Sequence, residues 1–182
     1  MKALKKKTLV CSMAGLFFSL LGSNVCSAKT TVAGGTVNFN GSVVSAACAV
    51  KGTSTNQTVQ LDQVRSARLA NIGDSIENRP FTIELIDCDK TVATYVQAYF
   101  TGSEASTAGL LSTSNKTIGI QILDGASKPL ALNKNDVSGL SAATDVIDTE
   151  TILSFKTKIV SLAKPVVASS YNATAYFNLV YP

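Results

Sequence analysis

Apolar and polar residues alternate along several segments of this chain, a pattern typical of β-strands with one buried face. In residues 35–43, one set of alternate positions is apolar or small and the other is polar. The apolar or small set consists of Gly35, Val37, Phe39, Gly41 and Val43. The same period of two recurs in residues 118–122, 153–159 and 177–181. Each of these segments is predicted to be a strand.

Further strands are predicted from short runs rich in β-branched and aromatic residues. They are Thr58–Leu61, Phe81–Ile86 and Thr94–Thr101. Clusters of Gly, Ser, Asn and Thr lie between them, at 51–56 and 102–109. About eight to ten short strands joined by turns indicate an all-β antiparallel sandwich in a single domain. A helical turn is predicted only in Val64–Asn71.

The two ends of the predicted sheet arrangement are unusual. The last alternating run reaches Pro182, so its neighbour in the sheet is expected to come from a distant part of the sequence. The first run contains glycines at 34, 35 and 41, so it packs weakly and loses backbone entropy when it becomes ordered. We expect this segment to be mobile on its own. From the residues alone, an ordinary first edge strand is the simpler interpretation.

Residues 1–28 have the order of a cleaved secretory signal. Lysines cluster between Lys2 and Lys7, a mostly apolar stretch follows from Thr8 to Gly22, and Cys26-Ser27-Ala28 supplies small residues. A membrane anchor is the alternative, but roughly 15 apolar residues fall short of the ~20 that span a bilayer. Val25 before Cys26 also argues against a lipidated cysteine. Cleavage is expected after Ala28.

The formal net charge of +4 comes from the predicted signal segment and not from the rest of the chain. The chain has 16 Lys and Arg against 12 Asp and Glu, and four of the lysines precede residue 8, where there is no acidic residue. The remainder therefore has 12 basic and 12 acidic side chains. A neutral body with no basic tract argues against nucleic acid as a partner. An apolar content of 46% with 15% charged residues excludes a disordered chain.

Removal of residues 1–28 also leaves two cysteines, Cys48 and Cys88. In an exported chain two cysteines most simply form one disulfide. A reactive thiol pair would need CxxC spacing or a nearby base, and neither is present. Closing a loop of about 41 residues stabilises the fold by roughly 4 kcal/mol.

Residue patterns that could support catalysis or metal binding lack the context that they need. The chain contains no His, which is the commonest general base and metal ligand. Ser161 and Lys164 match S-x-x-K, but no S-D-N or K-T-G accompanies them. Two groups of acidic residues could suggest a metal site, Asp87-Cys88-Asp89 and Asp145, Asp148 and Glu150. Neither group follows a calcium-loop pattern, and adjacent residues of a strand point to opposite faces. We expect no catalytic residues, no cofactor and no metal.

Five blocks together carry a resemblance to a known family. They are GGTVNFNGSVVSAACAV (34–50), QTVQLDQVRSARLA (57–70), FTIELIDCD (81–89), IGIQILD (118–124) and ATAYFNLVYP (173–182). In this order, and over nearly the whole exported chain, they resemble a major subunit of type 1 fimbriae, a chaperone-usher pilin of Gram-negative bacteria. The spacing of the two remaining cysteines also fits the family disulfide. Ser169 and Pro182 depart from the family pattern, which usually has Gly and a polar residue there.

The resemblance implies an incomplete immunoglobulin-like sandwich that lacks its last strand. Residues 29–41 would be a donor-strand extension, with Gly35, Val37 and Phe39 facing the groove of the next subunit, and residues 42–182 the pilin domain. Its acceptor groove and chaperone contact would include Phe177, Leu179 and Tyr181. The implied partners are copies of itself and other pilins, a periplasmic chaperone and an outer-membrane usher. The product would be exported through the periplasm to a cell-surface fimbrium.

The expected function is therefore a non-enzymatic subunit of a fimbrial shaft that supports adhesion. A minor pilin or adaptor of the same fimbria remains an alternative that the sequence does not separate from the rod subunit. A lectin-like adhesin is disfavoured because adhesins of this system resemble two joined domains and lack a donor extension. A monomeric secreted β-sandwich that binds a ligand is the remaining alternative.

Overall fold

A computed structural model describes residues 31–43 and 45–182. The chain divides into two units, Met1–Gly41 and Ser42–Pro182, and each is described by itself. The predicted export signal, residues 1–28, lies outside the described residues. None of the helices in the described part of the chain is long and apolar enough to cross a membrane.

The described residues of the first unit, 31–41, form neither helix nor strand. The side chains of Val37 and Phe39 are 72% and 90% exposed. The strand predicted for residues 35–43 is therefore absent from the single chain. The physical reason is that a strand is stabilised by a hydrogen-bonded neighbour, and a glycine-rich segment has little side-chain packing to replace one.

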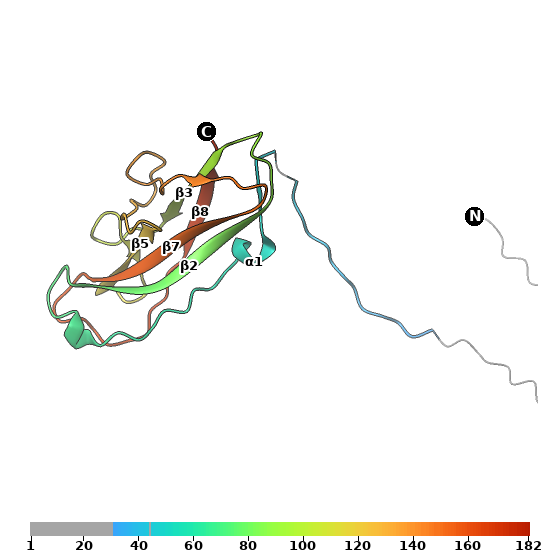
Figure 1. The fold of residues 1–182 in the computed structure, drawn as a ribbon. Coiled ribbons are helices and arrows are strands. Elements are labelled where there is room, and N and C mark those ends of the chain that lie inside the picture. The colour runs from blue at the N-terminus through green and yellow to red at the C-terminus, as the bar shows by residue number, and fades with distance from the viewer. Residues whose placement is uncertain (1–30, 44) are drawn as a thin grey trace, which may run out of the picture. The chain divides into compact units, whose positions relative to one another are not determined.

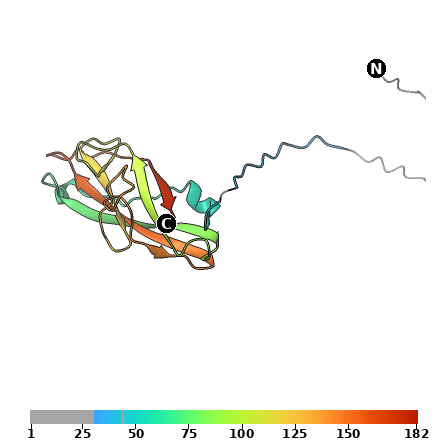
Figure 2. The ribbon, with the colours of Figure 1, turned by 90° about the horizontal axis from the view of Figure 1, so that it is seen from above.

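The second unit contains two antiparallel sheets (Figures 1 and 2). The first has the order β1 (Ala49–Val50), β2 (Ser75–Cys88), β7 (Thr149–Ser161), β5 (Ile118–Asp124) and β4 (Leu111–Ser112). The second has the order β6 (Thr144–Asp145), β3 (Tyr95–Gly102) and β8 (Ala175–Val180). All hydrogen-bonded neighbours run antiparallel. The all-β antiparallel prediction is confirmed.

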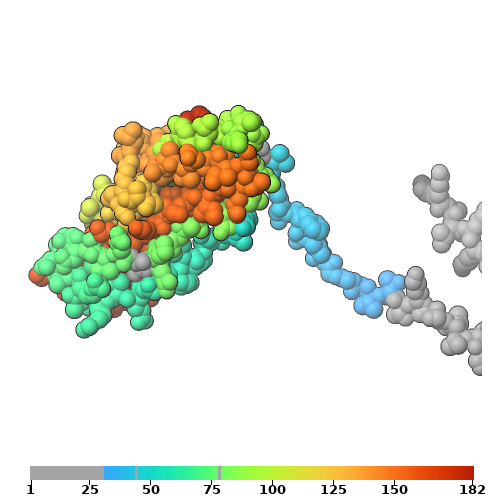
Figure 3. All heavy atoms as spheres, in the orientation of Figure 1, coloured from blue at the N-terminus to red at the C-terminus, as the bar shows by residue number. Residues whose placement is uncertain are grey.

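Strand β7 follows its predicted alternation closely. Leu153, Phe155 and Ile159 are buried, while Ile152 and Ser154 on the opposite face are exposed. This outer face of the β7 region lies open on the surface in Figure 3, where it is orange. One face of the strand therefore contributes to the core and the other does not.

Strand β5 differs from its prediction because it is buried on both faces. The predicted face of Ile118, Ile120 and Ile122 is buried, but Gly119 and Leu123 are buried as well. A Cβ atom placed on Gly119 would lie 3.1 Å from the Cβ of Leu110, so a neighbouring loop covers this second face. Alternation within one strand does not reveal such a covering.

Strand β2 begins six residues earlier than predicted, at Ser75 instead of Phe81. Its pairing with β7 is irregular between Glu77 and Pro80, where proline provides no N–H for the ladder. The hydroxyl of Thr157 compensates on β7. It accepts a hydrogen bond from the Arg79 N–H at 3.1 Å and donates one to the Arg79 carbonyl at 3.0 Å.

Two local predictions before β2 have opposite outcomes. The strand predicted for Thr58–Leu61 is wrong, because these residues belong to no sheet. The helical turn predicted in Val64–Asn71 is confirmed as the 3₁₀ helix η1 (Ser66–Arg68). A short helix, α1 (Gly52–Thr55), occupies a segment that was predicted to be a turn.

The core joins the two sheets through aromatic rings and one disulfide. Phe155 stacks on Phe81 with ring centroids 5.3 Å apart, and it meets Phe100 edge to face at 5.0 Å. Because Phe81 and Phe155 lie in the first sheet and Phe100 in the second, the three rings link the layers. The predicted disulfide between Cys48 and Cys88 is present, and both residues are buried.

Candidate functional site

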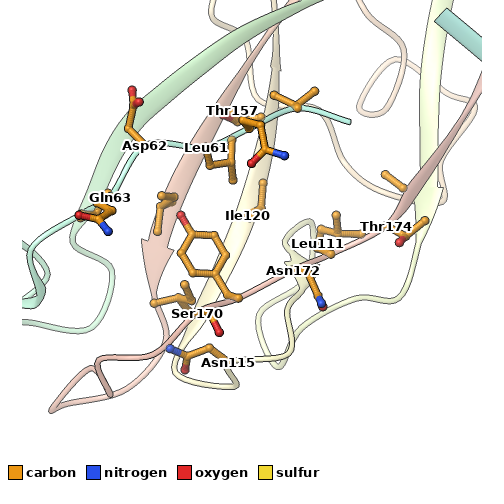
Figure 4. Close-up of a pocket in the computed structure, with 18 of the residues that line it drawn as sticks. Leu61, Asp62, Gln63, Leu111, Asn115, Ile120, Thr157, Ser170, Asn172 and Thr174 are labelled. Carbon is orange, nitrogen blue, oxygen red and sulfur yellow. The ribbon is translucent and has the colours of Figure 1, made fainter. Parts of the chain in front are cut away.

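A groove of about 1020 Å³ opens from the surface of the second unit into its core (Figure 4). Two segments form its sides. Residues 57–66, here called the N-terminal wall, precede β2. Residues 166–177, the C-terminal wall, include the start of β8, and all of them except Tyr176 line the groove. Figure 4 shows Leu61 on the first wall and Asn172 on the second, with Ile120 between them.

The floor of the groove consists of apolar side chains from both sheets. It is formed by Phe81 (β2), Phe100 (β3), Leu111 (β4), Ile118, Ile120 and Ile122 (β5), and Ile159 (β7). Several of them belong to the hydrophobic core that joins the sheets. The groove is thus a slot through which the core can be reached, as expected where a sandwich lacks one strand.

The main chain is able to accept a further strand at Thr58–Leu61 and at strand β8. Within the described part of the chain, Thr58–Leu61 makes no backbone–backbone hydrogen bond. Strand β8 lies at the edge of its sheet and is hydrogen-bonded on one side, to β3. Unpaired strand edges are templates for strand addition.

The C-terminal wall is held in place by side chains of the loop before β5. The buried Asn115 donates from Nδ2 to the carbonyl of Val167 at 2.8 Å. Ser114 and Asn172 exchange two hydrogen bonds of 3.0 Å, one from each backbone N–H. These contacts keep an irregular segment extended beside the groove.

The departure from the family pattern at Ser169 lies on this wall. Ser169 is exposed, and it is not among the residues with positive φ. Its backbone therefore does not require glycine, and the serine is accommodated without strain.

Tyr171 is the titratable residue of the C-terminal wall. Its side chain packs against the core, and its buried hydroxyl has no hydrogen-bond partner among the described residues. Burial raises the pKa of this hydroxyl above its usual value, and the negative charge of Asp62 acts in the same direction. Asp62 lies on the opposite wall, where its Oδ1 accepts a hydrogen bond from Arg79 at 2.8 Å.

Of the three residues predicted to line the acceptor groove, one lines it and two lie beyond it. Phe177 lines the groove. Leu179 and Tyr181 pack half-buried against the same core but lie beyond the groove lining. The Tyr181 hydroxyl is 3.5 Å from the carbonyl oxygen of Cys48, and burial raises its pKa. Contact of these residues with a chaperone stays a prediction.

The residues predicted to act as donors, Gly35, Val37 and Phe39, belong to the first unit. Their role in another subunit stays a prediction too.

Sequence reasoning missed most of the groove lining. Tyr171, Ala173 and Ala175 continue the odd-numbered alternation of β8 toward the N-terminus, and all three pack against the core. Extending that alternation would have found them. Asn115 and the N-terminal wall carried no comparable signal, because their place depends on contacts with residues about 50 to 100 positions away.

Three of the groups that resembled catalytic or metal sites make local contacts. Ser161 is buried and donates to the Ala163 carbonyl at 3.0 Å, while Lys164 Nζ donates to Asn71 Oδ1 at 3.1 Å. Asp148 pairs with Lys90 at 2.9 Å, and the side-chain hydrogen bond from Lys90 is the main cause of the lowered pKa of Asp148. These residues stabilise local structure.

Comparison with known proteins agrees with the fold. The family model described as "Fimbrial protein" matches residues 37–182. The chain is 35% identical to the type 1 fimbrial subunit of Salmonella typhimurium over 188 residues, covering 98% of this chain and 100% of that protein. It is also 35% identical to the type-1 fimbrial protein A chain of Escherichia coli over 191 residues, with the same coverage of both chains.

Among solved structures, a chaperone-usher pilus is similar in fold, with a TM-score of 0.68. The sequence identity is 23%, and the match covers 85% of this chain and 99% of that one. This likeness confirms the incomplete immunoglobulin-like sandwich predicted from the sequence. The chain therefore belongs to the fimbrial protein family, as an exported structural subunit of a bacterial surface fimbria.

Proposed function

We propose that this subunit polymerises by strand exchange, with residues 29–41 of one copy filling the groove of the next. The observation that carries the proposal is a groove that reaches the core between two walls, in a chain that also has an extension of matching pattern. The odd-numbered positions Gly35, Val37 and Phe39 are small or apolar, and Val37 and Phe39 are exposed in the single chain.

The dimensions of the extension and of the groove support this pairing. Residues 29–41 would span about 43 Å as a strand, at roughly 3.3 Å per residue. The C-terminal wall, residues 166–177, spans at most about 40 Å at the same rise per residue, because only its last residues belong to strand β8. An extended donor can therefore run along the whole wall.

The chemistry of the two surfaces is also complementary. The floor offers Phe81, Phe100 and Ile120 to apolar donor side chains. The alternate donor positions, Asn38 and Asn40 among them, would face solvent, as polar residues of a half-buried strand do. Main-chain hydrogen bonds to the walls would add affinity, as in other cases of strand addition.

Such exchange makes an open fibre, because donor and acceptor are different surfaces of one molecule. Before assembly the groove would hold a strand of a periplasmic chaperone, and an outer-membrane usher would pass the subunit to the growing fibre. Residues 1–28 would be removed on export, and residues 42–182 would be the folded pilin domain. The subunit would contribute structure to the shaft and catalyse no reaction.

Deleting residues 29–41 tests the proposal. The truncated chain should fail to form fibres in electron micrographs and should terminate fibres when it is mixed with the intact chain, because it accepts a strand but donates none. A matched control is Asn38→Ala, which changes the outward face and should leave fibres normal. Normal fibres from the truncated chain would refute strand exchange.

A further inference from the structure

Asn40 is followed directly by Gly41 near the end of the extension, and no other asparagine of the chain precedes a glycine. Both residues are exposed and lie outside helix and strand. Within the described part of the chain, the Gly41 N–H donates no hydrogen bond to another backbone group. A Cβ atom placed on Gly41 would meet no atom within 4 Å. The main chain at this pair is therefore open to reaction.

The sequence of this pair favours cyclisation of the asparagine side chain. The backbone nitrogen of Gly41 attacks the amide carbon Cγ of Asn40, so that a new C–N bond forms and the Cγ–Nδ2 bond breaks. The proton of the Gly41 nitrogen leaves with Nδ2 as ammonia, and the product is a cyclic succinimide. Because glycine has no Cβ and a freely rotating backbone, its nitrogen is the least hindered of any residue.

Water then opens the succinimide at one of its two carbonyl carbons. Cleavage of the new bond to Cγ gives aspartate with the normal main chain. Cleavage of the original peptide bond gives isoaspartate, in which the main chain runs through the former side chain and is longer by one carbon. Both products add one negative charge, and neither step consumes an oxidant or a reductant.

Cyclisation depends on the conformation of the main chain at Asn40. Its backbone must rotate until Cγ reaches the Gly41 nitrogen. Among the described residues of the extension, 31–41, none is paired in a sheet that would prevent this rotation. A strand in a sheet is held near one pair of dihedral angles, and its N–H groups are engaged in the ladder. A free extension should therefore react faster than one inserted as a strand.

We infer that Asn40 is a site of spontaneous deamidation in the unassembled subunit and that assembly protects it. The protection rests on the strand exchange proposed above, whereas the reactivity of the free extension does not. Isoaspartate at position 40 would displace the main-chain groups that follow Phe39 by one atom, within the donor segment 29–41. A subunit that stays unassembled for long would thus become a poorer donor.

The test compares the free and the inserted extension of the full chain. In the free form, the groove is filled by a synthetic peptide of residues 29–43 carrying Asn40→Asp, so the subunit's own extension has no groove to enter. In the inserted form, the same chain is assembled into fibres. Both forms are incubated at neutral pH, and peptide mapping by mass spectrometry follows the conversion of each asparagine to aspartate or isoaspartate.

In the free form, Asn40 should be converted while Asn38 stays intact, because Asn38 is followed by Phe39 and not by glycine. Fibres should retain the amide of Asn40 over the same period. Gly41→Ala is the matched variant, and it should suppress the conversion of Asn40 in the free form. The added methyl group has room at this position.

A second measurement tests the effect on donation. The recipient is the full chain carrying Phe39→Asp, which prevents it from donating. A peptide of residues 29–43 with isoaspartate in place of Asn40 should bind it about three- to tenfold more weakly than the Asn40→Asp peptide, the loss expected for one hydrogen bond. The two peptides have the same charge, so the comparison isolates the added main-chain carbon.

The outcomes are distinct. Conversion of Asn40 no faster than that of Asn38 in the free form would overturn the inference, and so would equal conversion of Asn40 in the free form and in fibres. Equal binding of the two peptides would overturn the poorer donation. Failure of the native peptide to bind the recipient would overturn strand exchange and the protection with it, and the comparison of Asn40 with Asn38 in the unassembled chain would still decide the reactivity.

Discussion

Truncating Phe39 to alanine should weaken donation more than any other single truncation in the extension. Phe39 is 90% exposed in the single chain, so nearly all the free energy of burying its ring is gained when the strand enters a groove. Full burial of such a side chain is worth about 2–3 kcal/mol. The truncation should therefore weaken binding about 30- to 140-fold, at 1.4 kcal/mol for each tenfold change.

The assay compares peptides of residues 29–43 on one recipient, the full chain with Phe39→Asp. Peptides with the native sequence, with Phe39→Ala and with Asn38→Ala compete with a fluorescent native peptide, and anisotropy reports the remaining bound fraction. The Asn38→Ala peptide should compete within about twofold of the native peptide, because exposed polar positions contribute little. The ratio of the two truncations thus measures which face of the donor is buried.

Equal weakening by Phe39→Ala and Asn38→Ala would refute the reasoning, because the two faces of the donor would then be equivalent. Stronger weakening by Asn38→Ala would show that the opposite face enters the groove. Binding by a peptide with Phe39→Asp as tight as by the native peptide would exclude an apolar site for residue 39.

Three other changes give defined outcomes. Replacing Cys48 and Cys88 by serine should lower the free energy of unfolding in urea by about 4 kcal/mol, because a closed loop of about 41 residues is released; unchanged stability would contradict this. Asn115→Ala should lower it by about 1–3 kcal/mol, because buried polar groups of the C-terminal wall lose their partner. It should also speed amide exchange in that wall, and unaltered exchange would argue against anchoring. Lys90→Met should raise the lowered pKa of Asp148 toward its usual value in an NMR titration. In the native chain the stabilisation by Asp148 is present above the unfolded pKa of about 3.9 and is lost as pH falls through the lower folded pKa. A pKa unaffected by Lys90→Met would assign the shift to another group.

The strands that were predicted correctly are those in which apolar residues alternate with polar residues and the apolar face is buried. In β7, Leu153 and Phe155 alternate with exposed residues, and the structure buries the expected face. In β8, Phe177 and Leu179 face the core as predicted. Alternation suffices in these strands because their neighbours are present within the same chain.

Predictions failed where a strand depends on something outside its own sequence. Thr58–Leu61 has strand-like residues but joins no sheet within the described part of the chain. The first half of β2 looks irregular in sequence, yet Thr157 satisfies the backbone of Arg79 and continues its pairing with β7. Period and propensity report how a segment packs, whereas hydrogen-bonding neighbours are set by distant residues.

The sequence by itself determined that the chain is all-β, which face of β7 and of β8 is turned to the core, that its body is neutral and which two cysteines pair. Those properties follow from residue type, from the alternation of apolar and polar residues, or from the numbers of charged residues and cysteines. The tertiary structure alone decided that residues 57–66 and 166–177 lie on either side of an open core, and that Tyr171 is left with an unpaired hydroxyl between them. A groove is made by the absence of a neighbour between segments about 100 residues apart, and no local pattern encodes an absence.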